Sequence, residues 1–238
     1  MSDNETVTQS QGPKCLASID ESFLVTRLKD FEGYGYDLTR NISYPWPLAN
    51  ASVPTGLPFP KINCCTFVEA LLVKSWEDAL LAGTKPQGNP EVARRFWNPQ
   101  RHKQMMILGS DLFSPITAVI EAGMATRVED LKTPPPPWTL VQGWRDMKAK
   151  KGGHTFLIVA ERNGTVLTLE ANASYNLNGV GFRGLGNAEK FSFKPPQGWW
   201  QNSALWKDGK VWTWQRIRDC YPDLQMAPLK VTRLEWAG

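Results

Sequence analysis

The clearest hydrophobic pattern in the chain is helical and covers residues 64–82. In CCTFVEALLVKSWEDALLA, apolar side chains recur every three or four residues, the spacing that places them on one helix face. Asn63 stands at the position of a helix N-cap, and Gly83 is of the residue type that commonly ends a helix. The pattern therefore predicts a helix that begins at Cys64.

Shorter helical patterns flank this helix on both sides. Residues 15–32 predict an amphipathic helix, and residues 90–108 and 115–124 predict two more. Residues 1–13 are polar and predict a flexible tail. Residues 33–62 are rich in Pro, Gly, Asn and Ser, and they predict a long loop that wraps the domain. The amino-terminal part of the chain is therefore expected to be helical.

A run of four prolines, residues 134–137, ends the helical part, and the pattern after it is typical of strands. The predicted strands are 138–144, 154–160, 165–171, 179–184, 190–194, 210–216 and 229–236. Asn163-Gly164 joins the second and third of them, and Asn-Gly is the strongest short signal for a β-hairpin. Helices followed by antiparallel strands predict an α+β fold. We expect one domain over residues 1–238, with 84–137 as a helical insertion.

Composition and charge narrow the class of protein. The net charge is +4 and the pI is near 8.9, but the Lys and Arg residues are scattered, so we expect no nucleic-acid partner. No apolar run reaches the roughly 18–20 residues of a membrane span, so we expect no membrane partner. The N-terminus has neither the basic nor the apolar region of a secretory signal. We expect a monomeric protein that is cytoplasmic or exported by a non-Sec route.

Cysteine and tryptophan are the two residue types whose use is informative. Without a secretory signal, the four cysteines are expected to be free thiols: Cys15, Cys64, Cys65 and Cys220. The adjacent pair lacks the CxxC spacing of zinc sites, so we expect no metal and no cofactor. Eleven residues are tryptophan, and five of these lie close together: Trp199, Trp200, Trp206, Trp212 and Trp214. We interpret this cluster as core and strand packing, with a sugar-binding surface as the alternative.

The candidate chemistry centres on Cys64 and His154. A helix N-terminus stabilises negative charge and lowers the pKa of a thiol, so a cysteine at the first helical position is a candidate nucleophile. His154, one of only two histidines, opens a strong strand and could be the base that deprotonates the thiol. Glu170 and Asn172 have the same parity on the next strand, so both face one side of the sheet and could orient the imidazole. Taken singly, a buried structural cysteine and a strand-edge histidine are the simpler interpretations.

These residues resemble a known family. Asn-Cys-Cys-Thr-Phe-Val, which opens the predicted helix, resembles the Asp/Asn-Cys-x-x-Phe-Val start of the NlpC/P60 superfamily of papain-like cysteine hydrolases. Gly-Gly-His-Thr-Phe-Leu-Ile-Val, followed by Asn-Gly-Thr-Val-Leu-Thr-Leu-Glu-Ala-Asn, resembles its CHAP branch. The order Cys, His, Glu, Asn also matches. The resemblance covers residues 62–73 and 138–185, about a quarter of the chain.

The resemblance implies a papain-like fold with Cys64 as nucleophile, His154 as general base, and Glu170 and Asn172 as orienting residues. The implied activity is that of an amidase or peptidase that acts through a thioester, with a peptidoglycan peptide as the first substrate. Without a Sec signal, such an enzyme would reach the wall as a delivered toxin or a phage lysin. A toxin would have an immunity or inhibitor protein as its partner. A cytoplasmic amidase acting on a small amide needs neither route.

The sequence leaves several alternatives open. CHAP sequences often read Cys-Thr-aromatic, which would make Cys65 the nucleophile, although we prefer Cys64. An acyltransferase would use the same thioester with another acceptor, and a non-catalytic glycan-binding module would use the tryptophans alone. Gln142 or Trp144 could line the cleft. Arg183 could bind a substrate carboxylate, or it could be a solvated surface residue.

Overall fold

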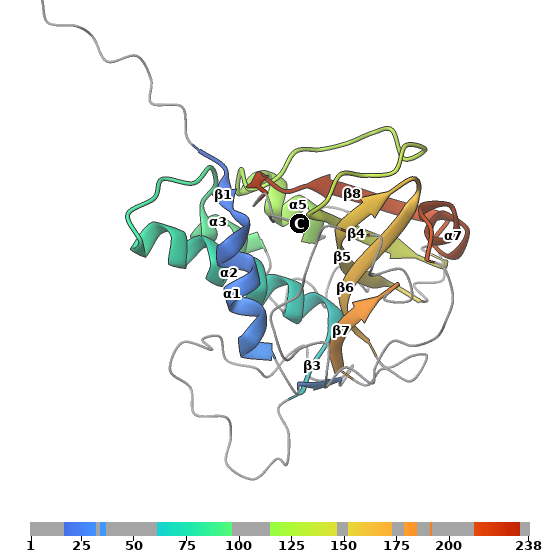
Figure 1. Cartoon of the computed structure of the whole chain (residues 1–238), viewed down its shortest axis with the longest axis horizontal. Helices are drawn as coiled ribbons and strands as arrows, with labels where there is room; N and C mark the ends of the chain where they lie inside the picture. Colours follow the sequence, from blue (N-terminus) through green and yellow to red (C-terminus); the bar gives the residue numbers. More distant parts are fainter. Residues whose placement is uncertain are drawn as a thin grey trace, which may run out of the picture.

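A five-stranded antiparallel sheet with helices on both faces forms the body of the molecule (Figure 1). The computed structural model describes residues 17–31, 34–36, 61–96, 115–146, 152–172, 179–184, 191 and 212–233, and every statement below concerns these residues. The helices are α1 (Glu21–Leu28), which a 3₁₀ turn extends over Lys29–Phe31, α2 (Cys64–Leu81), α3 (Pro90–Phe96), α5 (Pro115–Glu121) and α7 (Trp214–Cys220).

The sheet has the strand order β7-β6-β5-β4-β8, and every neighbouring pair is antiparallel. Its strands are β4 (Thr139–Trp144), β5 (His154–Arg162), β6 (Thr165–Asn172), β7 (Gly179–Arg183) and β8 (Asp223–Pro228). Two short parallel ladders join distant segments: β1 (Ile19–Asp20) with β9 (Val231–Thr232), and β2 (Gly35–Tyr36) with β3 (Lys61–Ile62). The predicted mixture of helices with an antiparallel sheet is therefore confirmed.

Helix α2 begins where the hydrophobic pattern predicts. The Asn63 side chain accepts a hydrogen bond from the backbone N–H of Thr66 at 3.0 Å, which is the expected N-cap. Gly83, with a φ of 78°, follows the last turn. Cys64 is therefore the first residue of a capped helix. No helix in the described segments is both long and apolar enough to cross a membrane.

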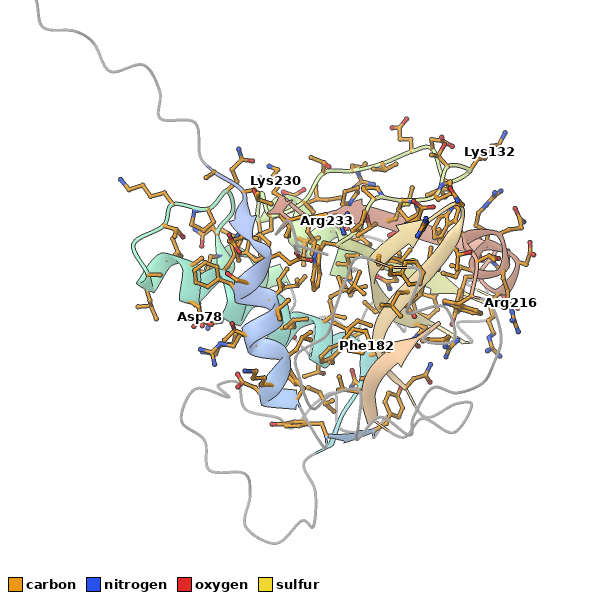
Figure 2. All side chains as sticks on the ribbon, in the orientation of Figure 1. Asp78, Lys132, Phe182, Arg216, Lys230 and Arg233 are labelled. Carbon is orange, nitrogen blue, oxygen red and sulfur yellow. The ribbon has the colours of Figure 1, made fainter. Side chains whose placement is uncertain are left out.

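The two faces of the sheet bury separate hydrophobic clusters. The larger cluster packs α1, α2, α3 and α5 against one face, with Leu71 of α2 and Leu157 of β5 among its fully buried members. The smaller cluster packs α7 against the other face, around Phe156. An ion pair between Arg27 and Asp78, the latter labelled in Figure 2, joins α1 to α2. The sheet is thus held between a helical layer and a single short helix.

A β-bulge in β5 sets which residues of the central hairpin share a face. At the predicted Asn-Gly turn Arg162 pairs with Thr165, but beyond the bulge Leu157 pairs with Leu169, a register shift of one residue. Side chains alternate between the faces of a strand, so a one-residue shift exchanges the face on which opposing residues meet. The bulge therefore determines which side chains of β6 can reach His154.

The strand predicted at 210–216 is wrong for its described residues. Thr213 instead caps helix α7, and its hydroxyl accepts a hydrogen bond from the backbone N–H of Arg216 at 3.2 Å. The helix buries Trp214 and Ile217 against the sheet. Their separation of three residues is a helical signal, but the aromatic and β-branched composition favours a strand. The cap and the packing override that preference.

Strand β8 is absent from the predicted set, because Pro222 precedes it and Pro228 ends it. Proline is tolerated there since β8 lies at the edge of the sheet, where one side of the strand has no ladder to support. Other predicted elements are present in their described residues: α1 lies within 15–32, α3 within 90–108, α5 within 115–124 and β9 within 229–236. The remaining predictions lie outside the described residues: the tail at 1–13, most of the loop at 33–62, most of the strand at 190–194, and Trp199, Trp200 and Trp206.

Candidate functional site

The amino end of α2 abuts the start of β5. The Sγ atom of Cys65 lies 3.3 Å from Oγ1 of Thr155, and the Cys64 thiol and the imidazole of His154 are near enough for each to shift the pKa of the other. Consecutive residues of the helix therefore reach consecutive residues of the strand. Cys64 and His154 are 7% and 8% exposed. The structure thus brings together the two residues on which the sequence prediction rests.

Glu170 adds a carboxylate to this arrangement, at Nε2 of the imidazole. Nε2 of His154 contacts Oε2 of Glu170 in a buried ion pair. Asn172 donates from Nδ2 to the same Oε2 at 2.9 Å, and its Nδ2 lies 3.4 Å from Nε2 of His154. Both β6 residues face the histidine, as their parity predicts. Glu170 is the direct partner of the imidazole, and Asn172 donates a hydrogen bond to the Glu170 carboxylate beside it.

Arg183 is neither solvated nor directed at an external carboxylate. It is 5% exposed, and its Nε atom lies 3.2 Å from Oε1 of Glu170. The register of β7 on β6 pairs it with Thr168, which places it on the same face as Glu170. Both alternatives offered by the sequence are therefore wrong. The guanidinium is paired internally because β7 folds back onto the strand that carries Glu170.

Two aromatic rings pack against the glycines that lie next to His154. The Tyr221 ring stacks on His154 with centroids 6.3 Å apart, and a Cβ atom at Gly143 would lie 2.5 Å from Cγ of that tyrosine. A Cβ atom at Gly153 would lie 2.5 Å from Cζ3 of Trp144. Both glycines therefore let a ring lie directly on the backbone next to His154. Trp144, a predicted lining residue, does flank the site.

Gln142, the other predicted lining residue, lies on β4 two positions before Trp144. It pairs in register with Thr155, so both side chains are on the sheet face that meets α2. Gln142 is 5% exposed, and its Oε1 atom has no hydrogen-bond partner among the described residues. Since Thr155 contacts Cys65, the carboxamide belongs to the surroundings of the thiol pair.

Tyr36 is a site residue that sequence reasoning missed. Burial, together with the neighbouring thiols of Cys64 and Cys65, raises the pKa of its phenol well above its usual range, which places Tyr36 beside the thiol pair. The short ladder β2–β3 pairs Tyr36 with Ile62, two residues before Cys64. In the sequence, Tyr36 is only an aromatic residue in a Pro-rich stretch that predicts a loop. No periodic signal connects it with a cysteine 28 positions later.

The electrostatics of the buried His154–Glu170 pair favour its charged form. Burial alone would lower the pKa of His154, but the Glu170 carboxylate and the contact with Cys64 raise it to about 9. Burial alone would raise the pKa of Glu170, but the charges of Arg183 and His154 lower it to about 2. A carboxylate and an imidazolium can therefore coexist here over most of the neutral range.

The two thiols are coupled to each other. Their Sγ atoms are 4.0 Å apart, so both cannot be ionised at once without strong repulsion. The hydrogen bond with Cys65 and burial raise the pKa of Cys64, whereas His154 acts to lower it. The bond with Cys64, aided by Thr155, lowers the pKa of Cys65. Ionisation of one thiol therefore opposes ionisation of the other, and His154 favours the thiolate of Cys64 whereas Thr155 favours that of Cys65.

The described segments hold no group of three His, Cys, Asp or Glu side chains placed to bind a metal ion. Cys64, Cys65 and Cys220 are free thiols, as predicted, and Cys15 lies outside the described residues. The chemistry that this arrangement supports is proton transfer from a buried thiol to an imidazole whose far nitrogen is held by a carboxylate.

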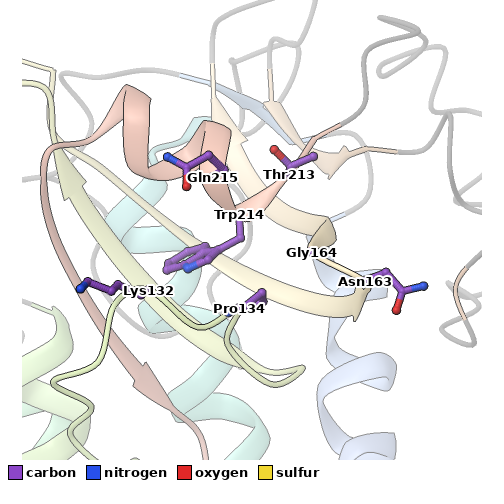
Figure 3. A pocket seen from close by; sticks show the side chains of 7 residues that line it. All are labelled: Lys132, Pro134, Asn163, Gly164, Thr213, Trp214 and Gln215. Atoms are coloured by element: carbon purple, nitrogen blue, oxygen red, sulfur yellow. The ribbon is translucent and has the colours of Figure 1, made fainter.

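A cavity of about 350 Å³ lies at the opposite end of the β5–β6 hairpin (Figure 3). The Trp214 ring, Pro134 and Lys132 line it beside the hairpin turn. The length of β5, nine residues from His154 to Arg162, separates it from the thiol pair by about 25 Å. Trp214 is 2% exposed and Trp212 7% exposed, so these two tryptophans pack in the core as predicted.

Comparison with known proteins gives no relative. The chain matches no family model, and no curated protein and no solved structure is similar to it. The functional argument therefore rests on the geometry of Cys64, His154 and Glu170 and on the sequence motifs that contain them.

Proposed function

We propose that this protein is a cysteine amidase or peptidase that cleaves an amide bond through a thioester on Cys64. The observation that carries the proposal is the contact series from the Cys64 thiol through the imidazole of His154 to the Glu170 carboxylate. A nucleophile, a base and a group that orients the base, all buried and in contact, are the parts that nucleophilic catalysis requires.

The reaction follows from these contacts. Nε2 of His154 is engaged with Glu170, so Nδ1 is the ring nitrogen that can take the proton from Cys64. The thiolate attacks the amide carbonyl, and the backbone N–H groups of Cys64 and Cys65 in the first turn of α2, which have no carbonyl partner within the helix, stabilise the oxyanion. His154 then gives its proton to the departing amine. Water hydrolyses the thioester and restores the thiol.

Cys64 rather than Cys65 is the nucleophile in this account. In the described part of the chain, His154 is the one basic side chain that hydrogen-bonds either thiol, and it contacts Cys64. Cys65 contacts the hydroxyl of Thr155, which accepts no proton at neutral pH. The lowered pKa of Cys65 is a property of the coupled pair, whereas proton delivery to a leaving group needs an imidazole.

The resemblance to the CHAP branch of the NlpC/P60 hydrolases supports a peptide of peptidoglycan as the substrate, and with it a papain-like fold. The roles implied by that resemblance fall on Cys64, His154, Glu170 and Asn172. Three of these are in direct contact, and Asn172 reaches both His154 and Glu170. Support from the sequence motifs and support from the geometry therefore concern the same four residues.

The test is hydrolysis of purified cross-linked muropeptides, followed by mass spectrometry of the fragments. We expect a mass gain of one water per bond cleaved, loss of activity in Cys64→Ala, and retained activity in Cys65→Ala. Adding a primary amine separates hydrolysis from acyl transfer, because an acyltransferase would give the amine adduct. Equal activity of wild type and Cys64→Ala would overturn the proposal. Activity lost in Cys65→Ala alone would move the nucleophile by one residue.

A further inference from the structure

The carboxyl group of Glu170 has several partners, and one of them brings a permanent positive charge. Thr168 donates from its hydroxyl to Oε1 at 3.0 Å, and Asn172 donates to Oε2 at 2.9 Å. His154 contacts Oε2 as well. The remaining partner is the guanidinium of Arg183, with Nε 3.2 Å from Oε1 and Nη2 3.4 Å from Oε2. Glu170 itself is 1% exposed, so these contacts replace water entirely.

Arg183 is held in this place by stacking as well as by charge. Its Cζ atom lies 4.7 Å from the centroid of the Trp212 ring, and Trp212 is 7% exposed. Arg216 of α7 lies 5.4 Å from the same centroid. Burying a guanidinium costs solvation free energy unless a carboxylate compensates it. The Trp212 ring and the register of β7 therefore hold the Arg183 guanidinium beside the Glu170 carboxyl group, which already has three other partners.

A buried histidine next to a carboxyl group can exist in two forms. In one form the carboxyl is ionised, and Nε2 of the imidazole must donate a hydrogen to it. In the other the carboxyl is protonated and donates to Nε2, which forces the imidazole hydrogen onto Nδ1. Low polarity favours the uncharged form, and a nearby cation favours the carboxylate. The two forms differ in function, because a hydrogen on Nδ1 prevents that nitrogen from accepting the proton of Cys64.

We propose that Arg183 is a positioning residue: it holds Glu170 as a carboxylate, so that Nε2 of His154 always carries a hydrogen and Nδ1 is the nitrogen that exchanges a proton with Cys64. The proton of the thiol then moves to Nδ1, which leaves a thiolate beside an imidazolium whose Nε2–H still donates to Glu170. This inference rests on the proposed function in that Cys64 is taken as the nucleophile.

The test measures the hydrogen on Nε2 directly, by ¹⁵N NMR of protein labelled in histidine. The chain has only His102 and His154, so a His102→Gln background leaves one imidazole to observe. At pH 7 we expect an Nε2–H in wild type and in Arg183→Lys, which keeps the charge. In Arg183→Met we expect Nε2 to be a bare acceptor and the hydrogen to lie on Nδ1. Arg216→Met is the matched control, since it removes an arginine from the same tryptophan ring.

Alkylation of Cys64 by iodoacetamide gives a second readout. Arg183→Met should slow it at pH 7 at least about tenfold, the factor that corresponds to 1.4 kcal/mol, whereas Arg183→Lys should stay within about threefold of wild type. Glu170→Gln should slow it similarly, and the double variant should add nothing, because both changes act on one carboxyl group. Arg183→Gln, which keeps hydrogen-bond donors without the charge, replaces Arg183→Met if the latter fails to fold.

An Nε2–H and a wild-type alkylation rate in Arg183→Met or Arg183→Gln would overturn the inference. Neither readout uses a peptide substrate. A wild type that shows this tautomer pattern but hydrolyses no muropeptide would contradict the proposed function and leave the role of Arg183 standing. Muropeptide hydrolysis by Arg183→Met at the wild-type rate would contradict the role of Arg183 and leave the proposed function standing.

Discussion

His154 and Glu170 meet because β5 contains one extra residue. From the hairpin turn, unbroken pairing would place Glu170 opposite Leu157, on the face away from His154. The bulge between Ile158 and Ala160 shifts the register by one, which places His154 and Glu170 on a common face. A bulge next to a functional group is a common device for aiming a side chain. Here it brings the imidazole of His154 to the carboxylate of Glu170.

Removing the hydroxyl of Tyr36 should make Cys64 less reactive. The phenol stays protonated at neutral pH and can donate a hydrogen bond to the neighbouring sulfur, which would stabilise the thiolate. In Tyr36→Phe we expect the alkylation of Cys64 at pH 7 to fall about tenfold or more, because a hydrogen bond to a charged group is worth about 1.5–3 kcal/mol. The fold should persist, as circular dichroism can verify. An unchanged alkylation rate would show that the hydroxyl does not act on the sulfur.

Replacing Gln142 by leucine should stabilise the protein. Its Oε1 atom is buried without a hydrogen-bond partner among the described residues, which costs about 1–3 kcal/mol, and Leu140 and Leu157 are apolar neighbours on the same face. A gain of about 1 kcal/mol corresponds to a rise of roughly 2–4 °C in Tm for a domain of this size. Differential scanning calorimetry measures it. A clear fall in Tm would mean that the carboxamide contributes to the fold.

The charged pair should leave a signature in the pH dependence of stability. The pKa of His154 is raised to about 9, against about 6.5 in an unfolded chain, so the native protein holds this proton more tightly. Its contribution is complete below pH 6.5 and is lost as the pH rises through 9. The pKa of Glu170 is lowered to about 2, so its contribution is complete above about pH 4.3 and is lost as the pH falls toward 2.

Urea denaturation of wild type and His154→Ala between pH 5 and 10 measures this contribution. We expect the difference in unfolding free energy to be largest near pH 5–6.5 and to shrink steadily toward pH 9–10. Glu170→Gln should differ most from wild type above pH 5 and converge on it under acid conditions. A difference that does not vary with pH would mean that these residues stabilise the fold by packing and not by charge.

Much of the site could be predicted because its signals are local. A capped helix that begins at Cys64 is visible from Asn63 and the helical periodicity, and the Asn-Gly turn identifies the hairpin. The common face of Glu170 and Asn172 follows from the two-residue period of a strand. These features depend on residues within about ten positions of one another.

The parts that could not be predicted depend on distant pairing. Tyr36 reaches Cys64 through a two-residue parallel ladder, and Arg183 reaches Glu170 through the register of β7 on β6. No residue close in sequence to Tyr36 or Arg183 indicates with which distant strand, and in which register, its strand pairs. The bulge in β5 lies in a uniformly apolar run, where no polar residue marks the change of face. The aromatic residues around Trp214 favour a strand, and tertiary packing turns them into α7.

The rate of cysteine alkylation as a function of pH tests the central claim most directly. Native protein is treated with iodoacetamide, and each cysteine is followed by mass spectrometry, with Cys220 as an internal reference. The account predicts that Cys64 reacts fast well below pH 8 and that His154→Ala abolishes this advantage. A Cys64 that reacts no faster than a free thiol of pKa about 8.5, or one that is indifferent to His154, would contradict it.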